Sequence, residues 1–409
     1  MRILIISQYF WPEEFRINEL SVMLVERGHQ VTVLTGIPNY PGGSFFPGYR
    51  FIRNKTENYK GIKIIRVPLY PRGKGGGFRL SLNYLSFAFF ASILGPVKCR
   101  DSYDVIFVYE PSPITVGLPA VVMKKIKSAP IVFWVQDLWP ESLSATGTIK
   151  SKYILKMLEN LVRFIYYHCD LILAQSKSFI ESIVKTGVDR SKIEYFPNSA
   201  EAIFDTAAEC SEAMGHIELP KGFRIMFAGN IGVAQDFETI VTAAELIKNQ
   251  ADIHWVIVGN GSMFSWVQEQ IKLRQLSQTV HLLGRHPVEA MPSFFSRADV
   301  MLVTLRKGSI FALTIPAKVQ AYMASARPII AALDGEGART IEEAGAGLVS
   351  PSENPEMLAQ TVLKVYRMDE VQREKMALSG RKYFEENFEP NKLIDNLERW
   401  LKELTAEKK

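Results

Sequence analysis

One short apolar run of the sequence ends in two carboxylates and a tryptophan, and these side chains are the strongest candidates for catalysis. Asp137, Trp139 and Glu141 follow the run Ile131–Val135. A carboxylate at the end of a buried strand can hold or transfer a proton, and an indole ring beside it can stack on a sugar ring. Asp137 could instead cap the turn that Pro140 opens. We favour the first interpretation and predict that Asp137 and Glu141 are catalytic.

A glycine-containing loop between a strand and a helix is the best candidate for a phosphate site. Gly229, Asn230 and Gly232 follow the apolar run Arg224–Ala228 and precede the helical pattern Phe237–Lys248. Glycines let the backbone approach a phosphate, and the start of the helix supplies positive potential. The spacing is common in turns and is not the three-glycine fingerprint of dinucleotide sites. We predict that these three residues bind a phosphate group.

Three cations lie where they could complete such a site. Arg285 follows the strand pattern Val280–Leu283, and Lys318 opens the helical pattern Ala317–Ala324. A lysine in the first turn of a helix is unfavourable to the helix dipole, so a bound anion would explain its presence. Arg16 comes soon after the first strand pattern, where a surface role competes with an anion contact. We predict that Arg16, Arg285 and Lys318 bind an anionic ligand.

Metal and cofactor chemistry is not expected. The six histidines and three cysteines are dispersed, so none of them forms a cluster with metal-ligand spacing. The sequence contains neither a Gly-x-Ser-x-Gly elbow nor a phosphate-loop lysine motif. We therefore expect no metal and no cofactor. The few cysteines and an N-terminal apolar run that is too short for a signal peptide predict a cytoplasmic location.

Two series of alternating strand and helix patterns would position these residues. In the first series, the runs Arg2–Ile6 and Val31–Thr35 flank a helical pattern at Ile17–Arg27. Strand, helix and strand in that order form a βαβ unit, which requires a parallel sheet. A second series of the same kind begins at Arg224–Ala228 and ends in long helical segments that break near Pro390.

The interval between the two series defines the predicted domains. Residues 199–221 include small and acidic residues without a clear period, as a linker does. We therefore expect a Rossmann-like domain at 1–198, a linker at 199–221, a second Rossmann-like domain at 222–388, and a C-terminal helix at 389–409 that packs back on the first domain. The predicted fold class is α/β, with the two domains facing each other across a cleft. In such folds the ligand lies outside the carboxyl ends of the strands.

Composition and charge exclude several classes of protein. A chain of 409 residues with 47% hydrophobic and 22% charged residues can build two or three folded domains, which excludes a disordered or disulfide-stapled chain. The formal net charge is only +5, but residues 50–100 contain eleven Lys or Arg and a single acid, Glu57. This basic segment points to an anionic surface such as a phospholipid membrane. Nucleic acid is not expected, because the segment contains no recognised nucleic-acid-binding module.

Within the basic segment, the stretch Leu80–Val97 is uncharged and largely apolar. It is barely long enough to span a membrane, and basic residues on both sides give a spanning helix no preferred orientation. Two interpretations remain open: a buried helix that covers a sheet, or a helix that lies in the membrane interface. The interfacial helix would use four aromatic anchors, Tyr84, Phe87, Phe89 and Phe90. Its membrane association would weaken on neutralisation of three cations, Arg72, Lys74 and Arg79.

The sequence resembles the GT-B glycosyltransferases of family 4, and the resemblance covers essentially the whole chain. The stretches that carry it lie in both predicted domains, at 27–35, 38–43, 136–142, 227–232, 256–261, 283–285, 298–300 and 315–324. The stretch Gln136–Ser142 is similar to the branch that acts in bacterial O-antigen, capsule or exopolysaccharide assembly and that includes N-acetyl-L-fucosamine transferases.

The resemblance implies a retaining enzyme that uses a nucleotide sugar. The donor would be UDP-linked and would carry an amino or deoxy sugar, and the acceptor would be a lipid-linked saccharide at the inner face of the plasma membrane. The second domain would bind the donor through Gly229–Gly232, Arg285 and Lys318, with Arg16 contributing from the first. These cations and amides would stabilise the leaving diphosphate without a metal. Asp137 would lie near the acceptor hydroxyl or the reacting sugar.

Departures from the family pattern leave other functions open. Many members carry two glutamates, eight positions apart, that contact the donor sugar and its ribose, and Leu313 and Ala321 stand at those positions here. Asn230 and Gln235 stand near the place where an arginine and a lysine are frequent. The alternatives are a catalytically impaired, glycosyltransferase-like scaffold subunit and a nucleotide-sugar epimerase of the same fold.

Overall fold

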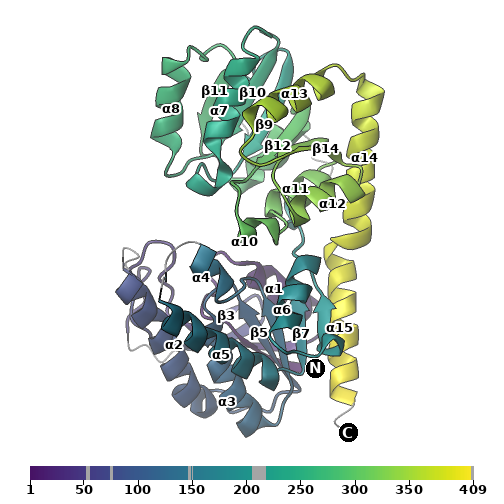
Figure 1. Ribbon diagram of the computed structural model, residues 1–409. Coiled ribbons are helices and arrows are strands. Elements are labelled where there is room, and N and C mark those ends of the chain that lie inside the picture. Colours follow the sequence, from purple (N-terminus) through teal and green to yellow (C-terminus); the bar gives the residue numbers. More distant parts are fainter. Residues whose placement is uncertain (52–55, 74–76, 146–148, 150, 205–217, 407–409) are drawn as a thin grey trace. The chain divides into compact units, whose positions relative to one another are not determined.

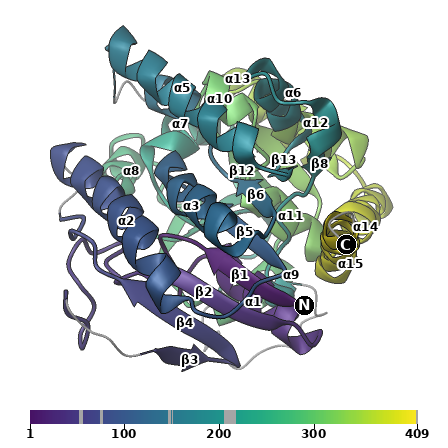
Figure 2. The ribbon, with the colours of Figure 1, turned by 90° about the horizontal axis from the view of Figure 1, so that it is seen from below.

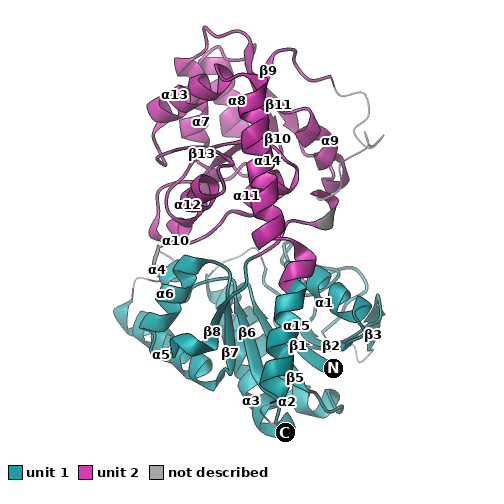
Figure 3. Ribbon diagram, turned by 90° about the vertical axis from the view of Figure 1, so that its right-hand side faces the viewer, with its two compact units in different colours: residues 1–197, 394–409 teal, residues 198–393 magenta. Residues whose placement is uncertain are grey.

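The chain divides into two compact units, each built on its own sheet. The computed structural model describes residues 1–51, 56–73, 77–145, 149, 151–204 and 218–406 (Figure 1). Unit 1 comprises Met1–Pro197 and Ile394–Lys409, and unit 2 comprises Asn198–Leu393 (Figure 3). The predicted fold class is confirmed in its elements: an α/β chain with two Rossmann-like units whose sheets consist mainly of parallel strands.

The sheet of unit 1 has eight strands in the order β3-β4-β2-β1-β5-β6-β7-β8. Their bounds are β1 (Arg2–Ile6), β2 (Gln30–Gly36), β3 (Glu57–Tyr59), β4 (Ile62–Val67), β5 (Val105–Glu110), β6 (Ile131–Val135), β7 (Leu171–Ala174) and β8 (Ile193–Tyr195). All neighbouring pairs are parallel except β3 and β4. The sequence patterns missed β3, because its three residues lie at the sheet edge and carry no apolar alternation.

Helices cover both faces of this sheet. They are α1 (Arg16–Glu26), α2 (Gly77–Lys98), α3 (Gly117–Lys127), α4 (Glu141–Ala145), α5 (Lys152–His168), α6 (Lys177–Lys185) and α15 (Pro390–Ala406), with 3-10 turns at η1 (Ile114–Val116) and η2 (Arg190–Lys192). Helices α2, α3 and α5 lie on one face, and α1 and α15 lie on the other (Figure 2).

Helix α15 contributes to unit 1 from Ile394 onward. His29 Nε2 lies 2.7 Å from Glu398 Oε1, and Arg27 forms an ion pair with Asp395. The Trp400 ring meets Phe196 edge to face at 6.1 Å between centroids. Ile394, Leu397 and Leu401 are fully buried, so the C-terminal helix packs on the first unit through an apolar face as well as through charged contacts.

The sheet of unit 2 has six parallel strands in the order β11-β10-β9-β12-β13-β14. Their bounds are β9 (Phe223–Ala228), β10 (Ile253–Val258), β11 (Val280–Gly284), β12 (Val300–Thr304), β13 (Ile329–Ala332) and β14 (Gly347–Ser350). The helices are α7 (Phe237–Leu246), α8 (Phe264–Leu273), α9 (Met291–Ser296), α10 (Ser309–Ala312), α11 (Ala317–Ala324), α12 (Glu336–Glu343), α13 (Pro355–Tyr366) and α14 (Glu370–Asn387), with 3-10 turns at η3 (Ala202–Phe204), η5 (Val233–Gln235) and η6 (Val288–Ala290).

The segment expected to be a linker, 199–221, differs from that expectation where the structure describes it. Residues 205–217 lie outside the described residues, but 198–204 belong to unit 2. Ala200 and Phe204 are buried in the core of unit 2, and the Phe204 ring stacks on Phe295 at 5.3 Å. A few apolar side chains without a regular period are enough to fix such a segment, because burial does not require periodicity.

Candidate active site

Two glycine loops pack backbone against backbone where β9 and β10 end. A Cβ atom on Gly259 would lie 1.8 Å from the carbonyl oxygen of Gly229, and one on Gly261 would lie 2.4 Å from that of Ile231. The Ile231 N–H donates to the Asn260 carbonyl oxygen at 2.9 Å. Gly259 and Gly261 therefore require glycine because the two loops approach each other so closely.

The amides of the predicted phosphate loop already have partners within the unit. Gly229 N–H donates to the Val258 carbonyl oxygen at 2.9 Å, and Gly232 N–H donates to Gln235 Oε1 at 3.2 Å. Asn230 Nδ2 also donates to Gln235 Oε1, at 3.3 Å. Gly229 and Asn230 are exposed, so a ligand can reach the loop. An anion can therefore reach the loop, but the positive charge that would bind it has to come from a side chain.

Lys318, in the first turn of α11, supplies that charge beside the loop. Its Nζ lies 3.4 Å from the centroid of the Phe227 ring, and a Cβ on Gly229 would lie 2.8 Å from Lys318 Cε. The Nζ atom is enclosed and makes no hydrogen bond within the part of the chain that the structure describes. Burial lowers the pKa of this amine to about 7. A buried cation without a counter-charge is costly, and an anion bound at the loop would remove that cost.

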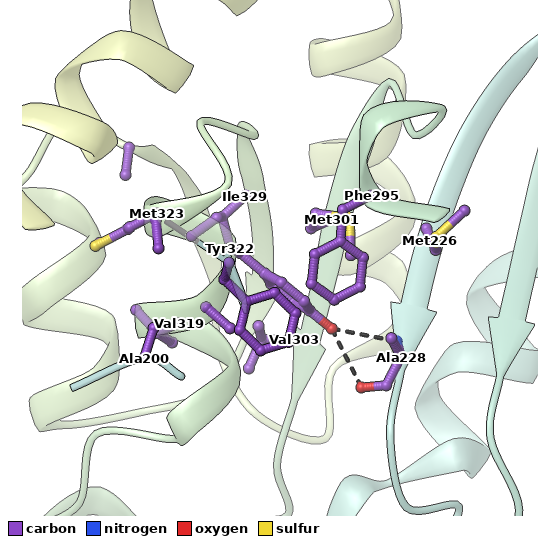
Figure 4. Packing of buried hydrophobic residues seen from close by; sticks show 14 of the residues in the cluster. Ala200, Met226, Ala228, Phe295, Met301, Val303, Val319, Tyr322, Met323 and Ile329 are labelled. Atoms are coloured by element: carbon purple, nitrogen blue, oxygen red, sulfur yellow. Dashed lines mark hydrogen bonds between the residues drawn. The ribbon is translucent and has the colours of Figure 1, made fainter. Parts of the chain in front are cut away.

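The core beneath α11 holds this lysine in place. Tyr322, one turn after Lys318, is buried, and its hydroxyl donates to the Ala228 carbonyl oxygen at 3.3 Å (Figure 4). The Ala228 N–H donates back to the same hydroxyl at 3.2 Å. Because Ala228 is the last residue of β9, this pair of hydrogen bonds joins α11 to the end of that strand, directly before Gly229.

Arg285 lies at the same edge of the unit 2 sheet, and Arg16 lies in unit 1. The Gly259 N–H donates to the Gly284 carbonyl oxygen at 2.7 Å, so the loop after β11, with the exposed Arg285, adjoins the glycine loops. Arg16 begins α1, and its charge opposes the rise that burial causes in the pKa of Tyr109. Unit 2 thus brings five predicted residues to one edge: Gly229, Asn230, Gly232, Arg285 and Lys318.

In unit 1, Asp137 is held at the carboxyl end of β6. Trp139 Nε1 donates to Asp137 Oδ2 at 3.2 Å. Burial raises the pKa of Asp137, and hydrogen bonds from the Ser142 and Trp139 side chains and the Leu138 amide oppose the rise. Glu141 begins the short helix α4, and its side chain is exposed. Of the two predicted catalytic carboxylates, only Asp137 lies within a network of side chains.

A second carboxyl group beside Asp137 was not predicted. Glu110 ends β5 and is 0% exposed, and the amides of Gln136 and Asp137 lie near its carboxylate without forming hydrogen bonds of normal geometry. Burial raises its pKa well above the usual range and the charge of Asp137 raises it further, although the amides of Asp137 and Gln136 oppose this. In the sequence, Glu110 directly follows the apolar run Val105–Tyr109, and an acid at the end of a strand pattern could have identified it.

Aromatic rings gather at the same edge of the unit 1 sheet, and they also were not predicted as a group. Tyr9 and Phe15 stack with centroids 4.9 Å apart, and Tyr40 lies 5.6 Å from Tyr9 and 5.2 Å from Phe15. Tyr84 of α2 meets Trp139 at 6.4 Å. These rings come from the loops after β1, β2 and β6 and from α2.

Glu13 holds the loops that carry these rings. The side chain is buried, and Oε1 accepts the N–H groups of Asn39 and Tyr40 at 2.8 and 2.7 Å. Oε2 accepts the Phe10 N–H at 3.3 Å. Burial raises the pKa of Glu13 to about 7, although these three amides and Arg66 oppose the rise. The loops after β1 and β2 are therefore joined through one carboxylate.

Each of the two units matches a known protein family. Residues 14–199 match the family "Glycosyl transferase 4-like domain", and residues 222–368 match the family "Glycosyl transferases group 1". The chain belongs to the family 4 glycosyltransferases. The predicted family is thereby confirmed, and the N-acetyl-L-fucosamine branch stays a prediction.

Relatives of this glycosyltransferase occur in bacteria. "Probable glycosyltransferase WbjE" of Pseudomonas aeruginosa is 29% identical over 244 residues, which span 58% of this chain and 60% of that protein. WcaI of Escherichia coli (strain K12), named for colanic acid biosynthesis, is 24% identical over 336 residues, which span 79% of this chain and 81% of that protein.

Solved structures share the fold of the glycosyltransferase over nearly its whole length. Sucrose-phosphate synthase from Thermosynechococcus elongatus has a TM-score of 0.73 and 16% identity, with 99% of both chains covered. HepE from Anabaena, in complex with UDP and glucose, has a TM-score of 0.68 and 15% identity, with 98% of this chain and 99% of that chain covered. At these identities the likeness concerns the fold alone.

The departures from the family pattern have a structural counterpart in this glycosyltransferase. Ala321 is buried in the core of unit 2, where a glutamate carboxylate would be desolvated. The neighbouring Gln320 donates through Nε2 to the Asn198 carbonyl oxygen at 2.6 Å. Among the described residues, no group of three or more His, Cys, Asp or Glu side chains could hold a metal ion.

Proposed function

We propose that this glycosyltransferase binds a nucleoside-diphosphate sugar, UDP-linked, at the carboxyl edge of the unit 2 sheet. The observation that carries the proposal is Lys318, an enclosed amine that has no carboxylate partner among the described residues and lies beside an accessible glycine loop. A diphosphate supplies the missing negative charge, and protonated Lys318 with exposed Arg285 stabilises that charge as the sugar leaves. The complexes of HepE with UDP and with UDP-glucose support a nucleotide sugar as the donor.

The acceptor, on this proposal, binds to unit 1 beside Asp137. An acceptor hydroxyl attacks the anomeric carbon, the bond from that carbon to the diphosphate oxygen breaks, and the hydroxyl proton passes to the leaving diphosphate or to Asp137. We propose retention of configuration, with attack from the face that the leaving group departs. Asp137, whose pKa is raised by burial, can accept a proton closer to neutral pH than an exposed aspartate can.

The biological setting that we propose is bacterial cell-surface polysaccharide assembly, O-antigen or capsule, on a lipid-linked acceptor. WbjE and WcaI support this setting, because they are named as glycosyltransferases and WcaI is named for colanic acid biosynthesis. The transferred sugar is proposed to be an amino or deoxy sugar, on the resemblance of Gln136–Ser142 to the corresponding branch. Neither a metal nor a cofactor takes part in the proposed reaction.

We propose further that the protein binds peripherally to the inner face of the plasma membrane through α2. Of the helices that the structure describes, α2 is the one long and apolar enough to cross a membrane by length and composition, and 28% of its apolar window is buried. A stripe of exposed residues recurs every fourth position: Leu85, Phe89, Ile93 and Val97. Exposed Arg79 and Arg100 flank the stripe, so anionic phospholipid fits both its apolar and its basic parts.

Two of the expected membrane anchors belong elsewhere in the structure. Phe87 is fully buried in the core, and Tyr84 packs against Trp139 at the candidate site. Helix α2 is therefore a covering helix on one side and carries its exposed apolar stripe on the other. The buried side agrees with the interpretation of a covering helix, and the membrane proposal rests on the exposed side.

Calorimetric titration with UDP tests the donor site. We expect the wild-type protein to bind UDP and Lys318→Met to lose about 10-fold or more in affinity, because a charge-assisted contact with phosphate is lost. Lys272→Met is the matched control, since Lys272 is exposed in α8 of the same unit. Absence of binding by any nucleoside diphosphate would favour the scaffold alternative, and release of a free epimerised sugar nucleotide without an acceptor would favour the epimerase.

A further inference from the structure

We propose that the carboxyl edge of the unit 1 sheet is a binding site for an anionic sugar, a pyranose ring that bears a carboxylate or a phosphate. Arg72 would bind the anionic group, and the rings of Phe15, Tyr40 and Tyr84 would contact the sugar. The inference rests on the proposed function, because it gives the acceptor of that reaction a chemical class.

The side chain of Arg72 is placed so that it could bind an anion. Its guanidinium carbon lies 5.0 Å from the centroid of the Tyr40 ring, and Nη1 donates to the Tyr9 hydroxyl at 3.1 Å. No described carboxylate forms an ion pair with it, and the residue is partly exposed. A guanidinium has five N–H groups in a planar fork that matches a carboxylate or a phosphate. The contact with the Tyr40 ring and the hydrogen bond to Tyr9 hold the guanidinium in place, and other N–H groups of the fork remain for a ligand.

A buried network of amide side chains fixes the backbone around Arg72. The Arg72 N–H donates to Asn39 Oδ1 at 3.1 Å, and Asn83 Nδ2 donates to the same oxygen at 3.3 Å. Gln8 Nε2 donates to Asn83 Oδ1 at 2.7 Å and to the Tyr9 hydroxyl at 3.4 Å. Gln8, Asn39 and Asn83 are almost fully buried. Such a network specifies one geometry, and it joins the loops after β1, β2 and β4 to α2.

The aromatic rings form the side of the site that a sugar would face. Tyr9 is buried and stacks on Phe15 with 11° between the ring planes, while Phe15, Tyr40 and Tyr84 are partly exposed. Aromatic rings with one face packed and the other accessible contact the apolar face of a pyranose, and their hydroxyls bind its polar groups. A lipid surface would not require this combination of accessible rings and buried amides.

The charges of Arg72 and Asp137 both affect the pKa of the Tyr84 hydroxyl. Burial raises the pKa of Tyr84; the charge of Arg72 and hydrogen bonds with Ser112 and Tyr9 oppose the rise, and the charge of Asp137 adds to it. The contacts of the site agree with this: the Trp139 ring meets Tyr84 at 6.4 Å and donates through Nε1 to Asp137, and Arg72 donates to the Tyr9 hydroxyl. A sugar anchored by its anion at Arg72 would direct a hydroxyl toward Asp137.

On this proposal Arg72 binds a sugar rather than the membrane surface for which the sequence analysis considered it. The guanidinium points to Tyr9 and Tyr40 in the site, whereas Arg79 is exposed on α2. Lys74, the third cation expected at the membrane, lies outside the described residues. The basic excess of residues 50–100 therefore includes at least one cation that serves a site for an anionic sugar.

Saturation-transfer NMR on the full-length protein, with UDP at saturating concentration, tests the inference. The probes are glucuronic acid, glucose 1-phosphate and methyl glucoside. We expect the ring protons of at least one anionic probe to be saturated several-fold more than those of the neutral probe. Arg72→Gln should abolish that preference, Tyr40→Leu should weaken both anionic probes, and Arg100→Gln, at an exposed arginine near the end of α2, should leave them unchanged.

The two anionic probes distinguish a uronic acid from a sugar phosphate as the source of the charge. Equal saturation of the neutral probe, no saturation of any probe, or an unchanged preference in Arg72→Gln would overturn the inference. The UDP titration is read separately in the same samples. If UDP binds but the anionic probes are not preferred, the donor proposal is supported and this inference is wrong. If the anionic probes are preferred but UDP does not bind, the donor proposal alone is wrong.

Discussion

Lys318 makes opposing contributions to stability and to binding. Its amine is enclosed and has no hydrogen-bond partner in the part of the chain that the structure describes, which costs about 1–3 kcal/mol for a buried polar group. Lys318→Met nearly keeps the length of the side chain and removes the charge, so we expect the free energy of unfolding of the unliganded protein to rise. Each kcal/mol gained should raise the melting temperature of unit 2 by about 2–4 °C. A thermal melt with and without UDP measures both effects. A lower melting temperature together with unchanged UDP binding would show that Lys318 is a structural residue.

The ionisation of Glu110 makes the free energy of unfolding depend on pH, and comparison with Glu110→Gln measures this dependence. Because burial raises its pKa in the folded chain, folded Glu110 keeps its proton to a higher pH than the unfolded chain does. The free energy of unfolding of the wild type should therefore fall, relative to Glu110→Gln, by about 1.4 kcal/mol per pH unit as pH rises above about 4.3. Urea unfolding of both proteins between pH 4.5 and 8 measures this difference. Parallel curves would mean that Glu110 ionises freely.

The loops after β1 and β2 depend on Glu13 as a shared acceptor. Glu13→Leu leaves the amides of Phe10, Asn39 and Tyr40 without their acceptor, so we expect the free energy of unfolding to fall by about 2–4 kcal/mol. Glu13→Gln keeps one oxygen for Asn39 and Tyr40 and should cost much less. Denaturant unfolding compares the two variants. Equal losses in both would indicate that charge, rather than the acceptor geometry, holds the loops.

The sequence predicted the elements well and the roles of several residues less well, for physical reasons. Helix Ala317–Ala324 has the bounds that its pattern predicts, because its apolar positions pack on both β9 and β12. Strand Glu57–Tyr59 carries no such pattern. The glycines at 229 and 232 were assigned to a phosphate by their type, whereas the structure commits their amides to Val258 and Gln235.

The candidate site of unit 1 shows why sequence alone missed some of its residues. Asp137 was found because it ends a visible strand pattern, and Glu110 lies at the equivalent end of the neighbouring strand. Arg72 was counted with the basic segment, since charge along the chain does not reveal which way a side chain points. The aromatic cluster joins residues 9, 15, 40, 84 and 139, and only the order of the strands brings them together.

At the scale of the whole molecule, the exposed stripe of α2 predicts membrane binding. We expect the protein to float with vesicles that contain phosphatidylglycerol and to bind less at high salt. Replacing Phe89 and Ile93 together by Asn should lower binding about 10-fold or more, because each apolar side chain contributes about 1.5–3 kcal/mol when buried.

The control for this membrane prediction replaces two exposed apolar residues of unit 2, Leu273 and Val371, by Asn. It should float like the wild type. Binding that does not change with salt would indicate insertion of α2 rather than docking on the charged surface. Binding that does not change in the α2 variant would place the membrane contact elsewhere.

The proposed reaction moves a sugar from a nucleotide sugar to a lipid-linked acceptor. Mass spectrometry of lipid extracts incubated with the protein and a set of nucleotide sugars tests it most directly. We predict one lipid species that gains the mass of one sugar, matched by release of a nucleoside diphosphate, and loss of both products in Lys318→Met and Asp137→Asn. Nucleotide sugars that remain intact with every acceptor, or full turnover in both variants, would contradict the account.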